Sequence, residues 1–200
     1  MSKPKEPLPA KLGIGLIYKE KTAAHSGWKA MEKIWGAIDF FSEVRPFEYT
    51  RYYEQEMGRP LYRRWAFFKD LVPQGRLSDI KWQALEIEKK WVIEDKRQLN
   101  LDPGLITAER LVLATGKNYS HRIYLGKGIF GDLTLLFYNK SYQPLVWTYP
   151  DYRDEQTIWM FNKIREKYLR DIADFGLRNY KGKESKKLPI VECEIIRENS

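Results

Sequence analysis

Short apolar runs in the first half of the chain predict four β-strands. Runs of this length, bounded by glycine, proline or charged residues, are typical of strands buried in a sheet. Pro46 favours an edge position for the second strand, because proline cannot donate a hydrogen bond to a neighbouring strand. The four predicted strands are residues 11–19, 38–47, 63–70 and 97–101.

Apolar residues spaced three or four apart predict two helices between these strands. The first begins at Ala23 and ends at Gly36, and the second begins near Ser78, whose side chain we expect to cap it. The order strand–helix–strand–strand–helix–strand predicts an α+β fold with a ferredoxin-like βαββαβ beginning. Residues 12–17, 64–68 and 97–101 should then share one sheet. We expect one face of it to carry Trp28, Ile80, Ile87 and Trp91.

The second half of the chain predicts an extension of this sheet. Asp102-Pro103-Gly104 contains turn formers that should break the fourth strand, and Thr107 should cap a two-turn helix over residues 108–115. A β-hairpin follows, with strands at 123–125 and 133–138 joined by a glycine-rich loop at 126–131.

A long C-terminal helix is predicted to close the fold. It begins at Asp154 or Glu155 and ends at Gly176, because apolar residues recur there at helical spacing. Its expected inward residues are Ile158, Phe161, Ile164, Tyr168, Leu169 and Ile172.

A chain of 200 residues is long enough for one domain with a sizeable core. We assign residues 11–178 to a single α+β domain, preceded by a flexible N-terminal arm at 1–10. A basic C-terminal tail at 179–200 ends in an apolar stretch, 188–196, which predicts a late strand or an ordered arm. Residues 1–9 and 181–187 lack apolar periodicity, so we expect both segments to be mobile.

The charge and the aromatic content bear on the kind of partner. A formal charge of +8 favours anionic partners such as nucleotides, RNA, phosphorylated metabolites or acidic lipid, although part of it lies in the terminal lysines. Aromatic residues make up 14% of the chain, and such rings fill cores, line ligand pockets or stack on bases.

The compartment is inferred from cysteine use and apolar runs. Cys193 is the only cysteine, which excludes an internal disulfide and favours a reducing environment. Residues 1–10 lack an apolar secretory core, and no apolar run approaches membrane-spanning length. The sequence therefore predicts a cytoplasmic protein with no membrane partner.

Four separated motifs carry a resemblance to a known family. Taken together, the motifs resemble the bacterial family called domain of unknown function 4416, over about residues 12–170. The resemblance implies a bacterial cytoplasmic protein but no established activity, although some members carry an automated GTP-binding label. Gly131 departs from the family, in which a bulkier residue is expected. The motifs are Tyr-Tyr-Glu-Gln-Glu-Met-Gly (52–58), Asn-Leu-Asp-Pro-Gly (100–104), Tyr-Ser-His-Arg-Ile-Tyr-Leu-Gly-Lys-Gly (119–128) and Trp-Thr-Tyr-Pro-Asp-Tyr (147–152).

A phosphate-binding P-loop is excluded by the glycine positions. Such a loop needs a glycine five residues before each Gly-Lys pair, but Leu111, His121 and Leu177 stand there. The glycines at 126, 128 and 131 match a dinucleotide-binding pattern, yet that motif requires a following helix and a strand is predicted instead. A hairpin turn explains these glycines better.

Candidate proton-transfer residues are His121 and Asp102. The adjacent Arg122 should lower the pKa of His121 and keep its imidazole neutral. Asp102 at a strand end can also cap a turn through its side chain. A magnesium ion could be held by Asp102 with Glu54 or Glu56, whereas two histidines and one cysteine this far apart predict no zinc site.

The remaining candidates predict a pocket for an anionic ligand. Because strand side chains alternate between faces, only one of Arg63 and Arg64 can face the site, and we include Arg64. The site residues are then the catalytic candidates His121 and Asp102 with Arg122, Lys127, Lys117, Asn100, Tyr53, Glu54, Glu56, Arg64, Trp147 and Tyr149.

The interpretation that follows is a protein that binds a phosphorylated small ligand such as a nucleotide. An RNA-binding protein and a non-catalytic interaction module stay open as alternatives, because exposed aromatics with basic tails could serve RNA and turn residues could serve loop geometry alone. The sequence leaves open whether there is a reaction, and it does not indicate an oligomeric state.

Overall fold

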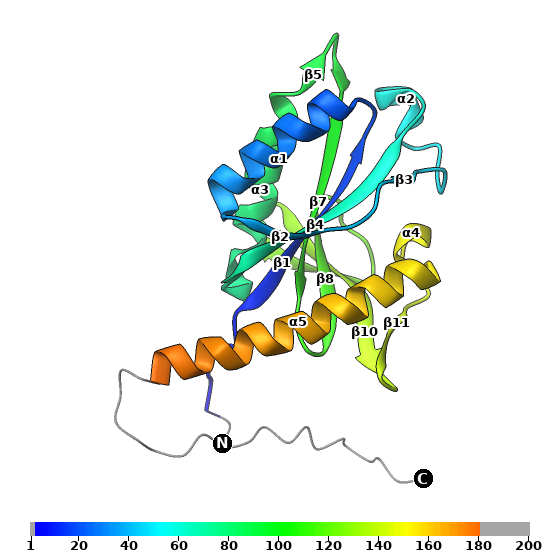
Figure 1. Cartoon of the computed structure of the whole chain (residues 1–200). Helices are drawn as coiled ribbons and strands as arrows, with labels where there is room; N and C mark the ends of the chain where they lie inside the picture. The colour runs from blue at the N-terminus through cyan, green and yellow to red at the C-terminus, as the bar shows by residue number, and fades with distance from the viewer. Residues whose placement is uncertain (1–2, 181–200) are drawn as a thin grey trace.

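All strand pairs of the main sheet are antiparallel. The computed structural model describes residues 3–180. The central strands are β1 (Ala10–Tyr18), β4 (Tyr62–Val72) and β7 (Leu99–Ile106), and the sheet order is β11-β10-β8-β7-β1-β4-β2, with β3 on β4 and β9 on β10 (Figure 1). The other elements are α1 (Lys21–Trp35), β2 (Ile38–Phe41), β3 (Arg45–Pro46), α2 (Glu54–Met57), η1 (Gln74–Arg76), α3 (Leu77–Lys89), β5 (Val92–Ile93), β6 (Lys96–Arg97), β8 (Arg110–Thr115), β9 (Arg122–Gly126), β10 (Ile129–Tyr138), β11 (Ser141–Pro144), α4 (Pro150–Arg153) and α5 (Glu155–Tyr180).

The predicted α+β class is confirmed. The strands β1, β4 and β7 lie in one sheet, as expected, in the local order β7-β1-β4-β2. The connection through α1 joins β1 to β2, and the connection through α3 leads from β4 toward β7; each passes over one intervening strand. No helix in the described range is long and apolar enough to cross a membrane.

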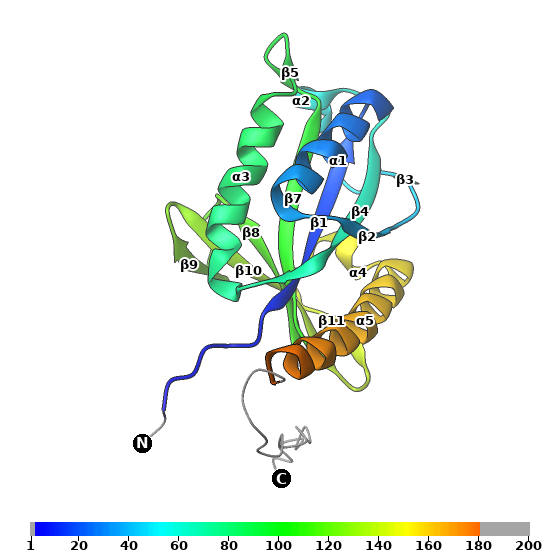
Figure 2. The same cartoon turned by 60° about the vertical axis from the view of Figure 1, so that its left-hand side comes forward.

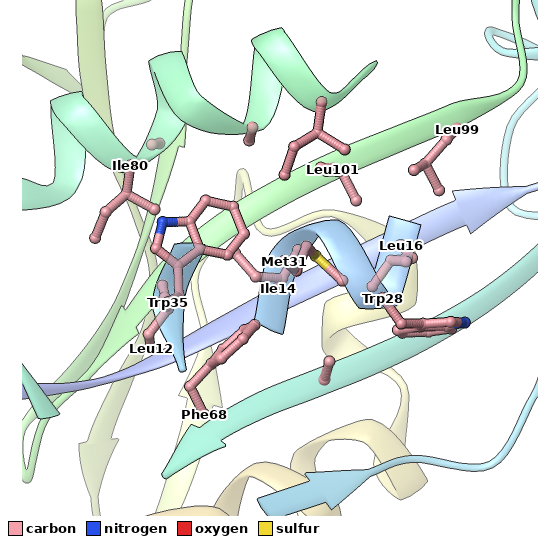
Figure 3. Close-up of a cluster of buried hydrophobic side chains, with 14 of the residues drawn as sticks. Leu12, Ile14, Leu16, Trp28, Met31, Trp35, Phe68, Ile80, Leu99 and Leu101 are labelled. Carbon is pink, nitrogen blue, oxygen red and sulfur yellow. The ribbon is translucent and has the colours of Figure 1, made fainter. Parts of the chain in front are cut away.

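Helices α1 and α3 cover one face of the central strands. They lie side by side over the sheet in Figure 2. Figure 3 shows Trp28, Met31 and Trp35 of α1 pointing toward strand residues such as Ile14 and Leu101. Burial of each such side chain contributes about 1.5–3 kcal/mol, so this layer is a major source of stability. Trp28, Ile80 and Ile87 belong to this cluster with Trp91 at its margin, which confirms the predicted common face.

Helix α5 and the short α4 lie over the opposite face. Phe161, Ile164 and Tyr152 pack there with Trp65 and Phe67 of β4. The successive residues of β4 thus alternate between the two layers, as strand geometry requires. Two helical layers therefore enclose the middle of the sheet.

Two predictions about residues 100–115 are wrong. Strand β7 continues through Asp102-Pro103-Gly104, and residues 110–115 form β8 instead of a helix. Pro103 pairs with Ile14 of β1, and β8 joins β7 only from Gly104 onward. Because Pro103 has a paired strand on one side alone, its missing amide is tolerated there.

The hairpin is correctly placed, but its turn is shorter than predicted. The turn lies at Lys127-Gly128, and Gly126, Lys127 and Gly128 have φ values of 100°, 55° and 75°. Gly131 lies within β10, where an added Cβ would come within 3.3 Å of Leu125 and Val112. Gly131 therefore serves close strand packing and not the turn.

Several predicted boundaries also shift. Ser78 is the second residue of α3 and caps nothing, because η1 leads directly into the helix. Helix α5 continues past Gly176, and Leu169 is exposed instead of inward. The fourth strand begins at Leu99, and residues 96–97 belong to the small β5–β6 hairpin. The tail segments predicted at 181–187 and 188–196 lie outside the described residues.

Candidate functional site

The open edge of β7 borders a cleft. In the part of the chain that the structure describes, residues 99–103 pair only with β1, so the strand is free on the side where β8 would continue. A cleft of about 620 Å³ lies here, a size typical of small-molecule sites. Its floor comes from β1, β4 and β7, and its sides come from residues 47–53, the end of β8 and residues 149–152.

Side chains of α3 satisfy the free backbone of this edge. The Leu101 N–H donates to Glu88 Oε1 at 2.6 Å, and Lys81 Nζ donates to the Leu101 carbonyl at 2.7 Å. Both side chains are buried, and an unpaired backbone group in such a place would cost about 1–3 kcal/mol. Helix α3 thus replaces a neighbouring strand and keeps the edge open toward the cleft.

A chain of hydrogen bonds runs along the floor from Arg97 to Asp102. Arg97 donates to Glu88, to Asn100 Oδ1 and to Glu56 at 2.8–2.9 Å. Asn100 Nδ2 then donates to Asp102 Oδ2 at 2.9 Å. Asn100 and Asp102 share a face of β7, because they are two residues apart in a strand. Both point to the cleft side, away from α1 and α3.

Arg63 is the most deeply buried cation of the cleft. Its side chain is 1% exposed, and its guanidinium lies 3.3 Å from Asp102 and 3.0 Å from Asp151. The rings of Trp65 and Tyr152 lie 4.7 and 5.1 Å from its central carbon. A buried charge of this kind is tolerated only when it is paired, and removing one partner typically costs about 3–5 kcal/mol.

Gly15 of β1 leaves the space for this arrangement. A Cβ at that position would come within 2.7 Å of Arg63 Nη2 and 2.9 Å of the Tyr152 hydroxyl. Gly15 is therefore required by the guanidinium packed on the sheet.

Burial shifts the pKa values of several of these groups. It raises the pKa of the Asp151 carboxyl, and the nearby Arg63 opposes that shift. It also raises the pKa of Glu88, against the effect of Lys81. The phenol of Tyr53 has its pKa raised by burial and by the charge of Asp102. Tyr53 is therefore a neutral hydrogen-bonding group at physiological pH.

Tyrosines from two distant segments form much of the cleft wall. Tyr49, Tyr52 and Tyr53 precede or enter α2, and Tyr149 and Tyr152 surround the start of α4. A small core of Ile17, Phe47, Met57 and Leu61 anchors the first segment to the sheet. The proline at the first position of α4 favours helix initiation and so fixes the second segment.

Lys117 lies at the exposed rim of the cleft. Its ammonium donates to the Tyr52 hydroxyl at 2.8 Å and lies 4.1 Å from the centre of that ring. The contact joins the β8–β9 connection to the segment before α2, so it bridges two sides of the opening.

The cleft brings together five of the predicted site residues. They are the acid Asp102, the amide Asn100, the rim cation Lys117 and the wall residues Tyr53 and Tyr149.

Three further predicted site residues do not line the cleft, namely His121, Arg122 and Trp147. His121 Nε2 lies 3.2 Å from Asp132 Oδ2, and Arg122 donates to that oxygen at 2.9 Å and to the Tyr149 hydroxyl at 2.7 Å. The Trp147 ring stacks on His121 at 4.8 Å. These residues fix the position of Tyr149 and of Asp132. No hydrogen bond joins His121 to Asp102 in the part of the chain that the structure describes.

The other four candidates also lie off the cleft. Lys127 on the hairpin turn pairs with Asp79 of α3 at 2.6 Å, and Glu54 pairs with the exposed Arg59. Arg64 faces the opposite side of β4, where it contacts the rings of Trp28 and Phe41. The fourth, Glu56, supports the floor from outside by binding Arg97.

The suggested magnesium ligands are each held in an ion pair. Asp102, Glu54 and Glu56 each pair with a different arginine. Within residues 3–180, no group of three or more histidine, cysteine or acidic side chains forms a metal site.

Sequence reasoning missed several residues that build the cleft. Arg63 was one of two adjacent arginines, and the side-chain alternation of its apolar neighbours Trp65 and Phe67 could have assigned it to the cleft face. Asp151 lies in the last of the four motifs, but its partner Arg63 is far away in sequence. Nothing local marked the remaining charged residues of the cleft, Lys81, Arg97 and Asp132.

The fold and the site define an α+β domain with a tyrosine-lined cleft above a floor of buried ion pairs. The chain belongs to the family described as domain of unknown function (DUF4416), whose family model matches residues 8–168. This match confirms the resemblance that the four sequence motifs carry. Comparison with curated proteins and with solved structures finds no match.

Proposed function

We propose that the cleft binds a phosphorylated small ligand such as a nucleotide. The observation that carries the proposal is that tyrosines from segments about a hundred residues apart line the same cleft. Large rings around a cavity of about 620 Å³ suit a planar ring, which can stack on a tyrosine or pack edge-on. Stacking on an aromatic side chain contributes about 1–3 kcal/mol for each base.

The phosphate of such a ligand is best placed at the rim, beside Lys117. The cations of the floor are already paired, because Arg63 contacts two carboxylates and Arg97 contacts two more. Within the described residues the ammonium of Lys117 contacts only the side chain of Tyr52, so its charge is available. A lysine serves a phosphate as a point charge and needs no fixed geometry.

The RNA-binding alternative is less well supported than a small ligand. It needs an exposed sheet face that carries aromatic side chains. Here α1 and α3 cover one face of the central strands, and α4 and α5 lie over the other. The tyrosines gather instead in one concave site.

Titration calorimetry with the full chain tests the proposal. The titrants are the ribonucleoside 5′-monophosphates, the free nucleosides, inorganic phosphate and a short single-stranded RNA. We expect the monophosphates to bind more tightly than the nucleosides or phosphate alone. Absence of binding by every monophosphate, or binding of the RNA alone, would overturn the proposal.

A pair of lysine variants locates the phosphate. Lys117→Gln should weaken binding of the monophosphate roughly tenfold, because a hydrogen bond to a charged group contributes about 1.5–3 kcal/mol. The matched control is Lys127→Gln, an equal change of charge at an exposed lysine outside the cleft. Its affinity should equal that of the unaltered protein. Equal losses in the two variants would show that only overall charge matters.

A further inference from the structure

Asp102 is the most open carboxylate of the cleft. Its side chain is 26% exposed, whereas those of Asp151 and Asp132 are 8% and 2% exposed. All three line the same cavity. Asp102 is therefore the carboxylate that a ligand in the cleft can reach most readily.

One oxygen of this carboxylate has no hydrogen-bond donor among the described residues. Oδ2 accepts hydrogen bonds from Asn100 at 2.9 Å and from Arg63 at 3.3 Å. Oδ1 accepts none from residues 3–180, and Lys81 Nζ, which lies 3.9 Å away, donates to the Leu101 carbonyl instead. Each carboxylate oxygen can accept about two hydrogen bonds. Asp102 thus offers unused acceptor capacity at the floor of the cleft.

The charges around Asp102 restrict what can donate to it. A ligand ammonium would be repelled by the positive charges of Arg63 and Lys81, which already neutralise the charge of the carboxylate. A ligand phosphate would be repelled by the negative charge of the carboxylate. A neutral hydroxyl avoids both repulsions and makes a charge-assisted hydrogen bond.

We propose that Asp102, positioned by Asn100 and Arg63, accepts hydrogen bonds from the ribose hydroxyls of the ligand. An acidic side chain on a ribose hydroxyl is also how dinucleotide-binding folds hold their ligand, so the chemistry is general. This inference rests on the proposed function, since it names the sugar of the nucleotide. It divides the cleft into a phosphate end at Lys117, tyrosine walls for the ring and a carboxylate for the sugar.

The test compares each ribonucleoside 5′-monophosphate with its 2′-deoxy form by titration calorimetry on the full chain. We expect the ribo form to bind about tenfold to a hundredfold more tightly, because the deoxy form lacks a donor to a charged acceptor. Equal affinities would overturn this inference and leave the proposed function standing. Binding of neither form would overturn both.

The variant Asp102→Asn assigns the preference to this residue. We expect its ratio of ribo to deoxy affinity to fall below about threefold, because a neutral amide oxygen is a weaker acceptor. Asp79→Asn, which alters an acid outside the cleft, is the matched control and should keep the full ratio. If Asp102→Asn folds and keeps the full ratio, the assignment to Asp102 is wrong. If it does not fold, the comparison of ribo and deoxy forms in the unaltered protein still decides whether the protein distinguishes the two sugars.

Discussion

At the scale of single residues, Arg63 and Arg64 show how alternation along a strand assigns function. The two arginines are adjacent in β4, yet Arg63 is buried beneath the cleft and Arg64 contacts the rings of the α1 side. Arg64 was the wrong choice of cleft residue, although the sequence does predict that only one of the two can face the site. The apolar neighbours distinguish the two arginines. Trp65 and Phe67 lie on the same face of β4 as Arg63, whereas Ala66 and Phe68 lie on the face of Arg64.

Replacing each arginine by alanine tests this assignment. Arg63→Ala should lower the free energy of unfolding by about 3–5 kcal/mol, because it leaves Asp151 buried without its partner. Arg64→Ala should cost less, about 2 kcal/mol, since it loses one charged hydrogen bond and the contacts with rings but leaves no buried charge unpaired. Urea denaturation of both variants measures the two losses. A larger loss for Arg64→Ala would contradict the assignment of faces.

At the scale of elements, helices with a clear helical spacing of apolar residues were predicted correctly. The prediction failed for a segment whose apolar pattern fits a helix and a strand equally well. The stripes of α1, α3 and α5 lie at helical spacing, and all three helices are present. Residues 111–114 form a continuous apolar run, which a buried strand and a helix share equally. These residues form a strand because they pair with β10, and the local sequence carries no sign of that long-range pairing.

Helix α5 is fastened by a group of ion pairs that no local pattern marks. The fully buried Lys11 lies 2.9 Å from Asp39 and 3.0 Å from Asp171, and Lys167 contacts the same two acids. Burial alone would raise the pKa of Asp171, but hydrogen bonds from Lys167 and Lys11 outweigh it and lower the pKa below the usual 3.8. The ionised acid therefore stabilises the docked helix.

Asp171→Asn should destabilise the protein at neutral pH on the order of 1–2 kcal/mol, between the values for exposed and buried pairs. Because the folded protein holds this pKa below the unfolded value, the contribution is present above pH 3.8 and is lost as the pH falls through the folded pKa. Denaturation at pH values from neutral to about 3 should show the gap to the unaltered protein closing. Glu166→Gln, in the exposed pair with Lys163 on the same helix, is the control and should change stability by less than about 1 kcal/mol. A gap that persists unchanged at the lowest pH would contradict the ionic account.

At the scale of the whole molecule, the cleft exists because β7 and β8 separate after a short pairing. Three of the four sequence motifs contribute residues to its lining, whereas the motif at residues 119–128 contributes none and contacts the lining residues from outside. Asp102, Asn100 and Tyr53 lie in the cavity, and His121 and Arg122 hold its wall from behind. Motif residues can be found in sequence, whereas the difference between lining a site and supporting it depends on side-chain direction in the folded chain.

We have proposed that a nucleotide-like ligand binds in this cleft. The most direct measurement is a ¹⁵N–¹H correlation spectrum of the full chain, titrated with the ribonucleoside 5′-monophosphates. We expect the amide signals of Tyr53, Asn100, Asp102 and Tyr149 to move in a saturable way, while those of Ala24 and Met31 in helix α1, on the opposite face of the sheet, stay in place. Signals that do not move with any monophosphate, or that move only away from the cleft, would contradict the account.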